Sequence, residues 1–377
     1  MVNKQALIVG AGLAGLTLAV ALRRYGWEVS VFEKSAALRE TGTGLHTWEN
    51  GLKVLEQLGL YKRATRGVQF LSSMELLDND HKLIHRIPFS DQLRFCVLPR
   101  VQLHTTLSDA ALKLGVQIHT NMEAKGADPN GTVTFVDGQQ RSGDLIVGAD
   151  GINSVIRDSI SNDHRMETVA DGSIRILIPR NEQDSPGIAT EYWNGTRRVG
   201  TATSSDSLLY VYLSAVTDDE VALAKSFSIE SWTSSFPFLR HVFERIPGND
   251  IHVNKTFYYV YVKRWVAGKV VLLGDAAHAM TPNLGQGAAS SMTSALEMAI
   301  QLNNSESIDD GLSKWEKRIR PMIEMTQIMA RAYGSSATVW PAELMGIRSH
   351  VLTEVLKSVD INEMISTAAR FVTSTNL

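Results

Sequence analysis

The residues with the clearest chemical potential form a glycine-rich turn near the start of this 377-residue chain. The turn reads Gly10-Ala11-Gly12-Leu13-Ala14-Gly15, and an acidic residue, Glu33, follows it. Gly10 allows a tight turn, Gly12 lets the backbone approach a pyrophosphate, and Gly15 lets the next helix pack closely. Glu33 would accept hydrogen bonds from a ribose diol and would repel a 2′-phosphate. This pattern predicts a dinucleotide site.

The segments around the turn are those that such a site requires. Ala6 to Val9 is a short apolar run, typical of a buried strand, and Leu16 to Tyr25 has the pattern of a helix. Gly26 stands where a helix C-cap is expected, and Trp27 to Phe32 predicts a second strand. The N–H groups and the dipole at the start of the helix would attract phosphates.

Four further residues are assigned to nucleotide contacts: Leu13 and Ala14 at the helix start, and Lys34 and Arg39 after the second strand. Arg39 is equally well explained as a solvated surface residue. Lys4 and the apolar stretch behind it imitate a signal peptide, but the glycines interrupt that stretch and a strand follows directly. We therefore expect a cytoplasmic protein.

Two later turns also combine glycine with an acidic residue. The apolar run ending at Gly148 leads into Asp150-Gly151 and a helix start, which favours a second contact at the cofactor edge. The apolar run after Gly268 ends in Gly274-Asp275. An Asp-Gly pair alone would indicate only a turn.

The third turn continues into a loop that contains Pro282. The loop runs to Gly285-Gln286-Gly287, and a long helix is predicted from Ala288 to Leu302. Backbone N–H groups at that helix start could bind an anionic or electron-rich group. His278 lies before the loop, and a single histidine in an alanine-rich turn is more often a packing residue than a general base.

Composition narrows the class of protein. The chain is 44% hydrophobic and 20% charged, with a net charge of −3, which does not favour nucleic acid as a partner. The single cysteine, Cys96, excludes an intrachain disulfide framework and fits a reducing compartment. No apolar run is as long as a membrane span. We predict no metal site.

The remaining strand patterns predict a second, sheet-based domain. Helices are expected at Val101 to Leu114, with Arg100 at its start facing an anionic cofactor, and in short pieces between residues 228 and 245. The segment Val97 to Arg100 leads into the first of these helices, and Thr41 to Gly44 is predicted to be a flexible loop. Two short strand patterns, Thr132 to Phe135 and Gln139 to Ser142, flank Asp137-Gly138, which is a strong hairpin signal. Candidate strands of the second domain are Val68 to Phe70, Met74 to Leu77, Lys82 to His85, Ser173 to Ile178, Arg197 to Ala202, Leu208 to Leu213 and Thr256 to Val262.

These patterns predict an α/β fold with a Rossmann-like nucleotide-binding domain, an inserted β-sheet domain and C-terminal helices. We assign residues 1–67, 99–170 and 263–330 to the first domain, 68–98 and 171–262 to the second, and 331–377 to the C-terminal helices. The helices expected near the end are Gly311 to Gln327 and Ala342 to Ser366. The oligomeric state is not predicted.

The three turns, in this order, resemble the class A flavoprotein aromatic monooxygenases, the para-hydroxybenzoate hydroxylase-like family. The resemblance covers about residues 4–330. It implies FAD as cofactor, with Glu33 on the adenosine ribose, Arg39 and Arg100 along the cofactor, and Asp275 on its ribityl or pyrophosphate part. Gly285, Gly287 and Ala288 would lie against the isoalloxazine. NADH or NADPH would visit only briefly, since no second nucleotide fingerprint is present. The flavin would react with O2 as a C4a-hydroperoxide.

Within that family, the chain is similar to the branch that oxidises hydroxypyridine carboxylates. Substrate-contacting residues of that branch fall on Arg175, Arg198 and Tyr210, next to the Pro282 loop. The resemblance implies a small anionic aromatic substrate, first a hydroxylated pyridine carboxylate, and it leaves ring opening undecided. One tyrosine of that branch has no counterpart, because this chain reads Leu71-Ser72-Ser73-Met74 there.

Other interpretations stay open. Arg175 and Arg198 could instead be surface residues paired with acids. The substrate could be a benzoate or a polycyclic phenol. A flavin reductase without oxygen insertion, a plain NAD-dependent dehydrogenase and a non-catalytic flavin-binding protein are further alternatives.

Overall fold

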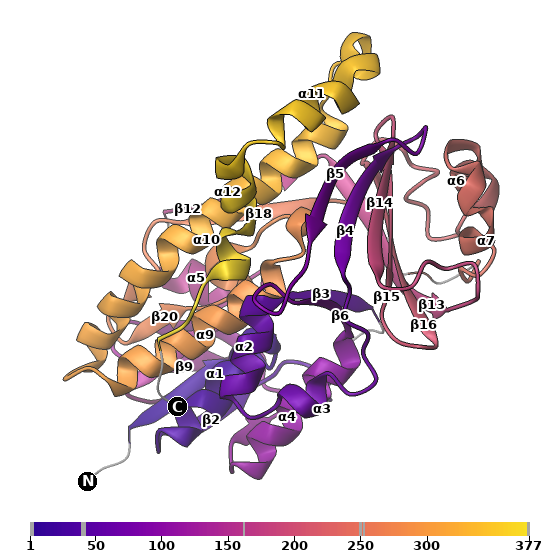
Figure 1. Ribbon diagram of the computed structural model, residues 1–377. Coiled ribbons are helices and arrows are strands. Elements are labelled where there is room, and N and C mark those ends of the chain that lie inside the picture. The colour runs from indigo at the N-terminus through magenta and orange to yellow at the C-terminus, as the bar shows by residue number, and fades with distance from the viewer. Residues whose placement is uncertain (1–3, 39–42, 161–162, 249–250, 252, 375–377) are drawn as a thin grey trace.

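The computed structural model describes residues 4–38, 43–160, 163–248, 251 and 253–374. Two large sheets dominate it (Figure 1). The first has six strands, parallel except for the edge strand β19. In sheet order they are β19 (Val266–Ala267), β20 (Val270–Leu272), β11 (Leu145–Gly148), β1 (Gln5–Val9), β2 (Glu28–Phe32) and β7 (Gln117–His119).

The six-stranded sheet is mostly apolar because both of its faces are covered. The helix α1 (Leu13–Arg24) packs on α4 (Arg100–Lys113) and on α9 (Gly287–Asn303). A three-stranded sheet of β8 (Ala124–Asp128), β9 (Thr132–Phe135) and β10 (Gln140–Ser142) also joins this core. The short helix α5 (Val155–Ile160) packs on β8. The predicted Rossmann-like arrangement is confirmed.

The predicted end of the first helix is also confirmed. Gly26 adopts φ +82°, and its N–H donates to the carbonyl of Arg23 at 3.1 Å. The hairpin predicted at Asp137-Gly138 is present as β9 and β10, with Gly138 at φ +85°.

The second large sheet has seven strands drawn from two distant parts of the chain. In sheet order they are β17 (Val253–Asn254), β13 (Asp171–Pro179), β16 (Leu208–Val216), β15 (Arg197–Thr203), β14 (Ile188–Asn194), β4 (Ser73–Asp78) and β5 (Leu83–Pro88). The two parts meet where β14 and β4 pair in parallel. Figure 1 shows this sheet at one side of the molecule, with the purple strands β4 and β5 beside the pink β13 to β16.

The two faces of the seven-stranded sheet pack on different partners. Ile174, Val199 and Val211 point to the outer face, where they pack with α6 (Ile229–Ser235), η1 (Pro237–Leu239) and α7 (Arg240–Phe243). Tyr210 and Tyr212 belong to the opposite, inner face. Successive residues of a strand point to opposite faces, so one strand contributes side chains to both faces of the sheet.

A two-stranded ribbon lies between the two large sheets and was not predicted. It pairs β3 (Gly44–Trp48) with β6 (Phe95–Pro99), and its apolar side chains pack on the inner face of the seven-stranded sheet. The sequence predicted a flexible loop at Gly44, and it predicted Val97 to Arg100 only as the lead-in to a helix, which follows as α4. The loop prediction at Gly44 was wrong, and the strand at Phe95–Pro99 was missed, because each short strand is defined only by its distant partner.

Two strand predictions need correction. Val68 to Phe70 is not a strand, since Val68 and Phe70 form only isolated bridges, to Ser205 and Cys96. The strand predicted at Thr256 to Val262 exists as β18 (Phe257–Val262), but it pairs with β12 (His164–Val169) in a separate sheet. Strand propensity identifies an extended segment without choosing its neighbour.

The C-terminal helices are longer and more divided than predicted. The helix expected at Gly311 to Gln327 is α10 (Ile308–Thr338), which packs on α9. The single stretch expected at Ala342 to Ser366 is divided into η3 (Ala342–Ile347), α11 (Arg348–Val355) and α12 (Val359–Arg370). The tail then returns to α9, where the backbone N–H of Ser374 donates to buried Glu297 at 2.7 Å.

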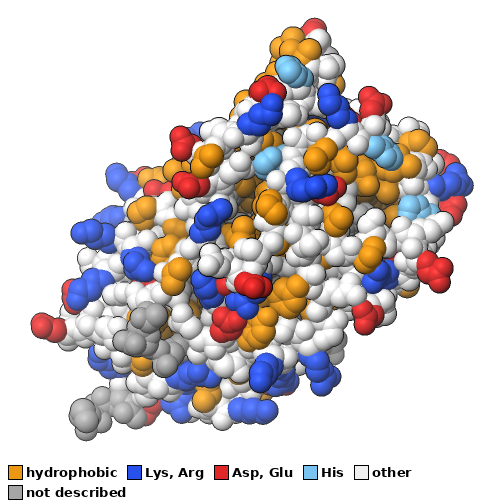
Figure 2. Space-filling view, viewed as in Figure 1, with side chains coloured by type: hydrophobic (Ala, Val, Ile, Leu, Met, Phe, Trp, Pro, Cys, Tyr) orange, Lys and Arg blue, Asp and Glu red, His pale blue; other side chains and the backbone are white. Residues whose placement is uncertain are grey.

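The surface drawn in Figure 2 carries both signs of charge interspersed, and apolar side chains gather in its upper part, toward the tip formed by the C-terminal helices. None of the helices in the described part of the chain is long and apolar enough to cross a membrane.

Candidate functional site

The glycine-rich turn joins β1 to α1 and is held by close backbone contacts. A Cβ on Gly10 (φ +103°) would lie 2.3 Å from the carbonyl oxygen of Ala149, and one on Gly15 would lie 2.2 Å from that of Gly10. Gly12 differs, because no atom of the described residues lies within 4 Å of its Cβ position. Gly10 and Gly15 are therefore required for packing, whereas Gly12 leaves room for a ligand.

The start of α1 is suited to an anion. Its N-cap residue, Gly12, makes no side-chain cap, and its first turn holds no acidic residue. Leu13, Ala14 and Gly15 form this first turn. The N–H groups of such a turn and the helix dipole favour negative charge.

Glu33 follows β2 and faces the same turn. Its carboxylate accepts hydrogen bonds from the N–H of Ala11 at 3.0 Å and of Ser35 at 2.9 Å. Burial alone would raise the pKa of Glu33, but these N–H donors and the charge of Lys34 lower it below its usual value. The group is thus an anion, as a ribose contact requires. Lys34 is exposed, and Arg39 lies outside the described residues.

The Asp150 carboxylate accepts hydrogen bonds from groups of the protein itself. Its carboxylate accepts from the Ser154 hydroxyl at 2.6 Å and from the N–H of Ile156 at 3.2 Å, so it caps α5. Buried Arg157 then donates to the carbonyls of Ile152 and Ala276, at 3.0 and 3.3 Å. This guanidinium ties the second turn to the third. A direct contact between Asp150 and a cofactor stays a prediction.

Asp275 begins the short helix α8 (Asp275–His278), directly after β20 and next to the first turn. A Cβ on Gly274 (φ +65°) would lie 3.0 Å from Ala14 Cβ, so the first and third turns touch. Solvent reaches the Asp275 side chain. Burial raises the pKa of its carboxyl, although the guanidinium groups of Arg100 and Arg175 oppose that rise.

The loop with Pro282 forms a 3-10 turn, η2 (Pro282–Leu284), ahead of α9. Gly285 adopts the left-handed conformation (φ +63°), and a Cβ there would lie 2.6 Å from His46 Cβ. Gly287 and Ala288 begin α9, whose N-cap makes no side-chain cap. As at α1, backbone donors at this helix start are left for a ligand.

The inner face of the seven-stranded sheet brings Arg175 and Tyr210 close to this loop. Tyr210 is buried, and its ring lies against Gly44 and 5.2 Å from the His46 ring. Burial raises the pKa of Tyr210, against the opposing charge of Arg175, so the phenol is protonated at neutral pH. No described residue accepts a hydrogen bond from Arg175, and its buried Nε has no partner.

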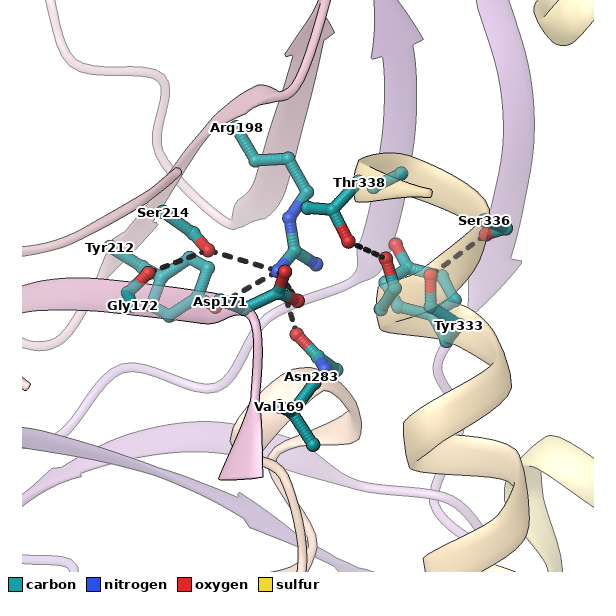
Figure 3. Close-up of polar contacts among 12 residues, drawn as sticks. Val169, Asp171, Gly172, Arg198, Tyr212, Ser214, Asn283, Tyr333, Ser336 and Thr338 are labelled. Atoms are coloured by element: carbon teal, nitrogen blue, oxygen red, sulfur yellow. Dashed lines mark hydrogen bonds and ion pairs between the residues drawn. The ribbon is translucent and has the colours of Figure 1, made fainter. Parts of the chain in front are cut away.

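Arg198 lies on the same face but is fully enclosed (1% exposed). Figure 3 shows its guanidinium surrounded by protein groups. One nitrogen donates to Asn283 Oδ1 at 2.7 Å and to Ser214 Oγ at 3.0 Å. Asp171 and Glu191 lie 3.9 and 3.6 Å away. The two arginines therefore differ: Arg198 is paired with acids, whereas Arg175 is not.

His278 is a packing residue. It is buried against Trp265, with ring centroids 5.2 Å apart, and neither ring nitrogen has a hydrogen-bond partner among the described residues. Burial lowers the pKa of His278 to about 4, so the imidazole is neutral. The expectation that this histidine packs rather than acts as a base fits the geometry.

Sequence analysis missed two residues of the site, His46 and Asn283. His46 lies between the Tyr210 ring and the Gly285 turn, and burial, with help from Arg175, lowers its pKa to about 4. Nothing in the sequence around His46 indicates this position. Asn283 follows Pro282 directly, so the sequence alone places it in the Pro282 loop.

Comparisons with known proteins now identify the class. The sequence profile of the FAD binding domain family matches residues 3–323, so the chain belongs to that family of FAD-dependent monooxygenases. It is 34% identical over 333 residues to a probable 2-heptyl-3-hydroxy-4(1H)-quinolone synthase of Rhodococcus erythropolis, covering 87% of each chain. It is 30% identical to a 2-heptyl-3-hydroxy-4(1H)-quinolone synthase of Mycobacteroides abscessus, over 95% of this chain and 99% of that protein.

Among solved structures, a variant of 2-methyl-3-hydroxypyridine-5-carboxylic acid oxygenase matches with a TM-score of 0.86 and 32% identity, covering 99% of each chain. Klebsiella pneumoniae HpxO, described in complex with FAD and uric acid, shares the fold with a TM-score of 0.85 at 22% identity. The predicted family, fold and FAD cofactor are confirmed.

The described residues fit FAD. The open space at Gly12, the uncapped start of α1 and the ionised Glu33 suit its adenosine diphosphate part. Asp275 and the uncapped start of α9 lie at the ends of β20 and η2, where the remainder of the cofactor would lie. When bound, FAD supplies the redox chemistry and the activation of O2.

Proposed function

We propose that this monooxygenase hydroxylates an aromatic N-heterocycle of the 4-quinolone type, with NADH or NADPH as the electron donor. One oxygen atom of O2 replaces the hydrogen of a ring C–H bond as a hydroxyl group, and the other leaves as water. NAD(P)H supplies the two electrons that balance this step. The observation that carries the proposal is the contrast between the unpaired Arg175 and the paired Arg198 on one sheet face.

The charge on that face supports a substrate with a single anionic centre. Asp171 and Glu191 already balance Arg198, which leaves Arg175 to bind an anion. Guanidinium groups bind ring oxygens and carboxylates with charge-assisted hydrogen bonds. A ring oxygen that becomes negative on deprotonation of a quinolone would satisfy one arginine.

The apolar lining supports a substrate that carries hydrocarbon. Leu71, in the segment Leu71 to Met74 that lacks the tyrosine of the hydroxypyridine branch, is buried in an apolar cluster with Trp48, Phe95 and Tyr210. Met74 and Leu177 are half-buried against the same cluster. An alkyl substituent would find apolar contacts there, and the relatives are named for a heptyl-substituted quinolone product.

In this proposal, each residue has a separate task. Arg175 binds the negative oxygen, Tyr210 and His46 shape the ring site, and the Pro282 loop with Gly285 covers it. FAD is bound by Leu13, Ala14, Glu33, Lys34, Asp275, Gly287 and Ala288. The apolar cluster excludes water, which protects the oxygen-transfer step. We keep the predicted division into a cofactor domain and a substrate domain as part of this proposal.

A second candidate is oxidation of a hydroxypyridine carboxylate, with or without ring opening. It is favoured by the match to 2-methyl-3-hydroxypyridine-5-carboxylic acid oxygenase over 99% of the chain. In that case Arg198 would have to exchange an acidic partner for the substrate carboxylate.

The test is NADH and NADPH oxidation by the purified yellow protein with one compound at a time, with product masses measured under ¹⁸O2. The compounds are 2-heptyl-4(1H)-quinolone, 4(1H)-quinolone, 2-methyl-3-hydroxypyridine-5-carboxylate and 4-hydroxybenzoate. We expect at least tenfold stimulation by the heptylquinolone, with one ¹⁸O atom in the product.

Stimulation by the pyridine alone would support the second candidate, and two ¹⁸O atoms in its product would indicate ring opening. Stimulation by the benzoate alone would reject both candidates. NAD(P)H oxidation that leaves no ¹⁸O in any organic product would favour a reductase.

A further inference from the structure

The cluster around Arg198 joins three parts of the fold. Arg198 comes from β15 of the seven-stranded sheet, Asn283 from η2, and Gly334 from α10 (Figure 3 shows the first two). We call these three residues the Arg198 cluster. Each of the three residues makes a contact with another of these elements, and that contact explains why this residue type stands at its position.

Arg198 is a buried charge that costs free energy unless it is paired and hydrogen-bonded. Ser214 and Tyr212 accept hydrogen bonds from it, at 3.0 and 3.3 Å, and both belong to the neighbouring strand. These contacts fix the guanidinium with respect to the sheet. Its shortest hydrogen bond, 2.7 Å, leaves the sheet and reaches Asn283.

Asn283 is the point at which the loop is attached to the sheet. It stands between Pro282 and Leu284, whose carbonyl accepts from Trp48 Nε1 at 3.1 Å. The next residue, Gly285, is pressed against His46. The loop is thus held at three successive residues, and Asn283 connects it to the charged side chain of Arg198.

Gly334 makes room for Asn283. A Cβ on Gly334 would lie 2.2 Å from Asn283 Nδ2 and 3.3 Å from Asp171 Oδ2. Glycine inside a helix is less favourable than alanine, so a glycine in α10 that no contact required would lower the stability of the helix. The close approach of the asparagine amide explains it.

We propose that the Arg198 cluster sets the position of the Pro282 loop, and so of the Gly285–Ala288 backbone, relative to the reacting ring. Arg198 is then a positioning residue that acts through Asn283. The inference rests on the proposed function in one respect: the loop must lie beside the flavin and the substrate.

Gly334→Ala tests the proposal through a residue that touches neither ligand. The change should aid the helix itself, yet it pushes Asn283 away from Arg198. Gly346→Ala in η3 is the matched control, since nothing lies within 4 Å of that Cβ position. Asn283→Ala removes the amide that accepts the hydrogen bond from Arg198. The double variant, Gly334→Ala with Asn283→Ala, tests whether the two changes act through this same contact.

Two sets of measurements separate the possibilities. Without substrate, the visible absorption, circular dichroism and fluorescence of bound FAD report on its surroundings. With the best substrate of the preceding test, product formed per NAD(P)H consumed reports coupling, with KM and kcat measured separately. We expect altered flavin spectra and an at least threefold loss of coupling in Gly334→Ala and Asn283→Ala, with KM changed less than twofold.

The double variant should lose no more coupling than Asn283→Ala alone, and Gly346→Ala should match the unaltered protein. Unchanged flavin spectra together with unchanged coupling in both single variants would overturn the proposal. A rise in KM of tenfold or more with coupling intact would instead assign Arg198 to direct substrate binding. If no tested compound is turned over, the spectra still decide whether the loop moved.

Discussion

The candidate ligand contacts of the two large sheets are of different kinds. Around the six-stranded sheet, the candidate contacts are backbone groups at strand ends and helix starts, such as those at Gly12 and Gly287. On the seven-stranded sheet, they are side chains in the middle of strands, such as Arg175 and Tyr210. The strands of the first sheet are mostly apolar, whereas the inner face of the second carries the charged side chains of Arg175, Arg198 and Glu191.

This difference explains how proteins of one fold can bind the same cofactor and different substrates. A backbone contact depends on the path of the chain, so it tolerates few substitutions. A side chain on a sheet face can change while the strand pairing stays, because ladder hydrogen bonds involve only the backbone. Arg175 and Arg198 illustrate the freedom this leaves: they share a face, yet only Arg198 is paired with acids.

The largest effect should come from the first turn. Gly10→Ala places a Cβ 2.3 Å from the Ala149 carbonyl oxygen at φ +103°. We expect a loss of several kcal/mol of folding free energy, roughly 3 or more, because strain and overlap add. Gly12→Ala should fold normally, since its Cβ enters open space, but should bind FAD at least tenfold more weakly.

Thermal melts and flavin absorbance per protein chain distinguish these two outcomes. A Gly12→Ala protein that folds and retains FAD with normal affinity would show that backbone approach at Gly12 is not what the cofactor needs. Ligand binding at the first sheet would then not depend on a backbone contact, and the contrast with the second sheet would no longer hold.

The next largest effect should come from Arg175. Arg175→Met keeps the aliphatic stem and removes the charge, and a charge-assisted hydrogen bond contributes about 1.5–3 kcal/mol. We expect KM to rise about 10- to 100-fold with the best substrate, while FAD affinity changes less than twofold. Arg180→Met, just past the end of the same strand, is the control, because its side chain contacts Gln69 at 3.5 Å. An unchanged KM in Arg175→Met would exclude this arginine as the anion contact.

A smaller, pH-dependent effect should come from His278 in the cofactor region. Its folded-state pKa is about 4, below its usual value of 6.5, so the unfolded chain binds the proton more readily. Stability is therefore fully present above pH 6.5 and is lost as pH falls toward 4. Between pH 7.5 and 5 this residue should account for about 2 kcal/mol of lost stability.

Urea unfolding of His278→Leu at the two pH values measures that contribution. The variant should lose about 2 kcal/mol less than the unaltered protein over this range. An equal loss in both proteins would mean that other groups cause the acid sensitivity.

The smallest effect should come from the exposed ion pair of Arg240 and Glu244 on α7, whose atoms lie 2.8 Å apart. Glu244→Ala should change the free energy of unfolding by less than about 0.5 kcal/mol, because solvent screens exposed pairs. Kinetics and FAD binding should stay unchanged. A clear change in KM would show that the outer face of the seven-stranded sheet also influences the site.

Local signals made the cofactor region predictable. The glycine turn, the Gly26 cap and the hairpin at Gly138 each depend on residues close together in sequence, and each was predicted correctly. The β3–β6 ribbon was missed, and β18 was grouped with the strands of the second domain although it pairs with β12 in a separate sheet, because pairing of distant strands leaves little trace in either strand alone.

The sequence by itself determined the family, its FAD cofactor and the presence of a second sheet, because these follow from short motifs and strand patterns. Only the tertiary structure decided which arginine is paired. Asn283 lies 85 residues from Arg198 along the chain, and the Gly334 helix that confines it lies further still. Whether a buried charge is available to a ligand depends on which distant groups surround it, and folding alone brings those groups together.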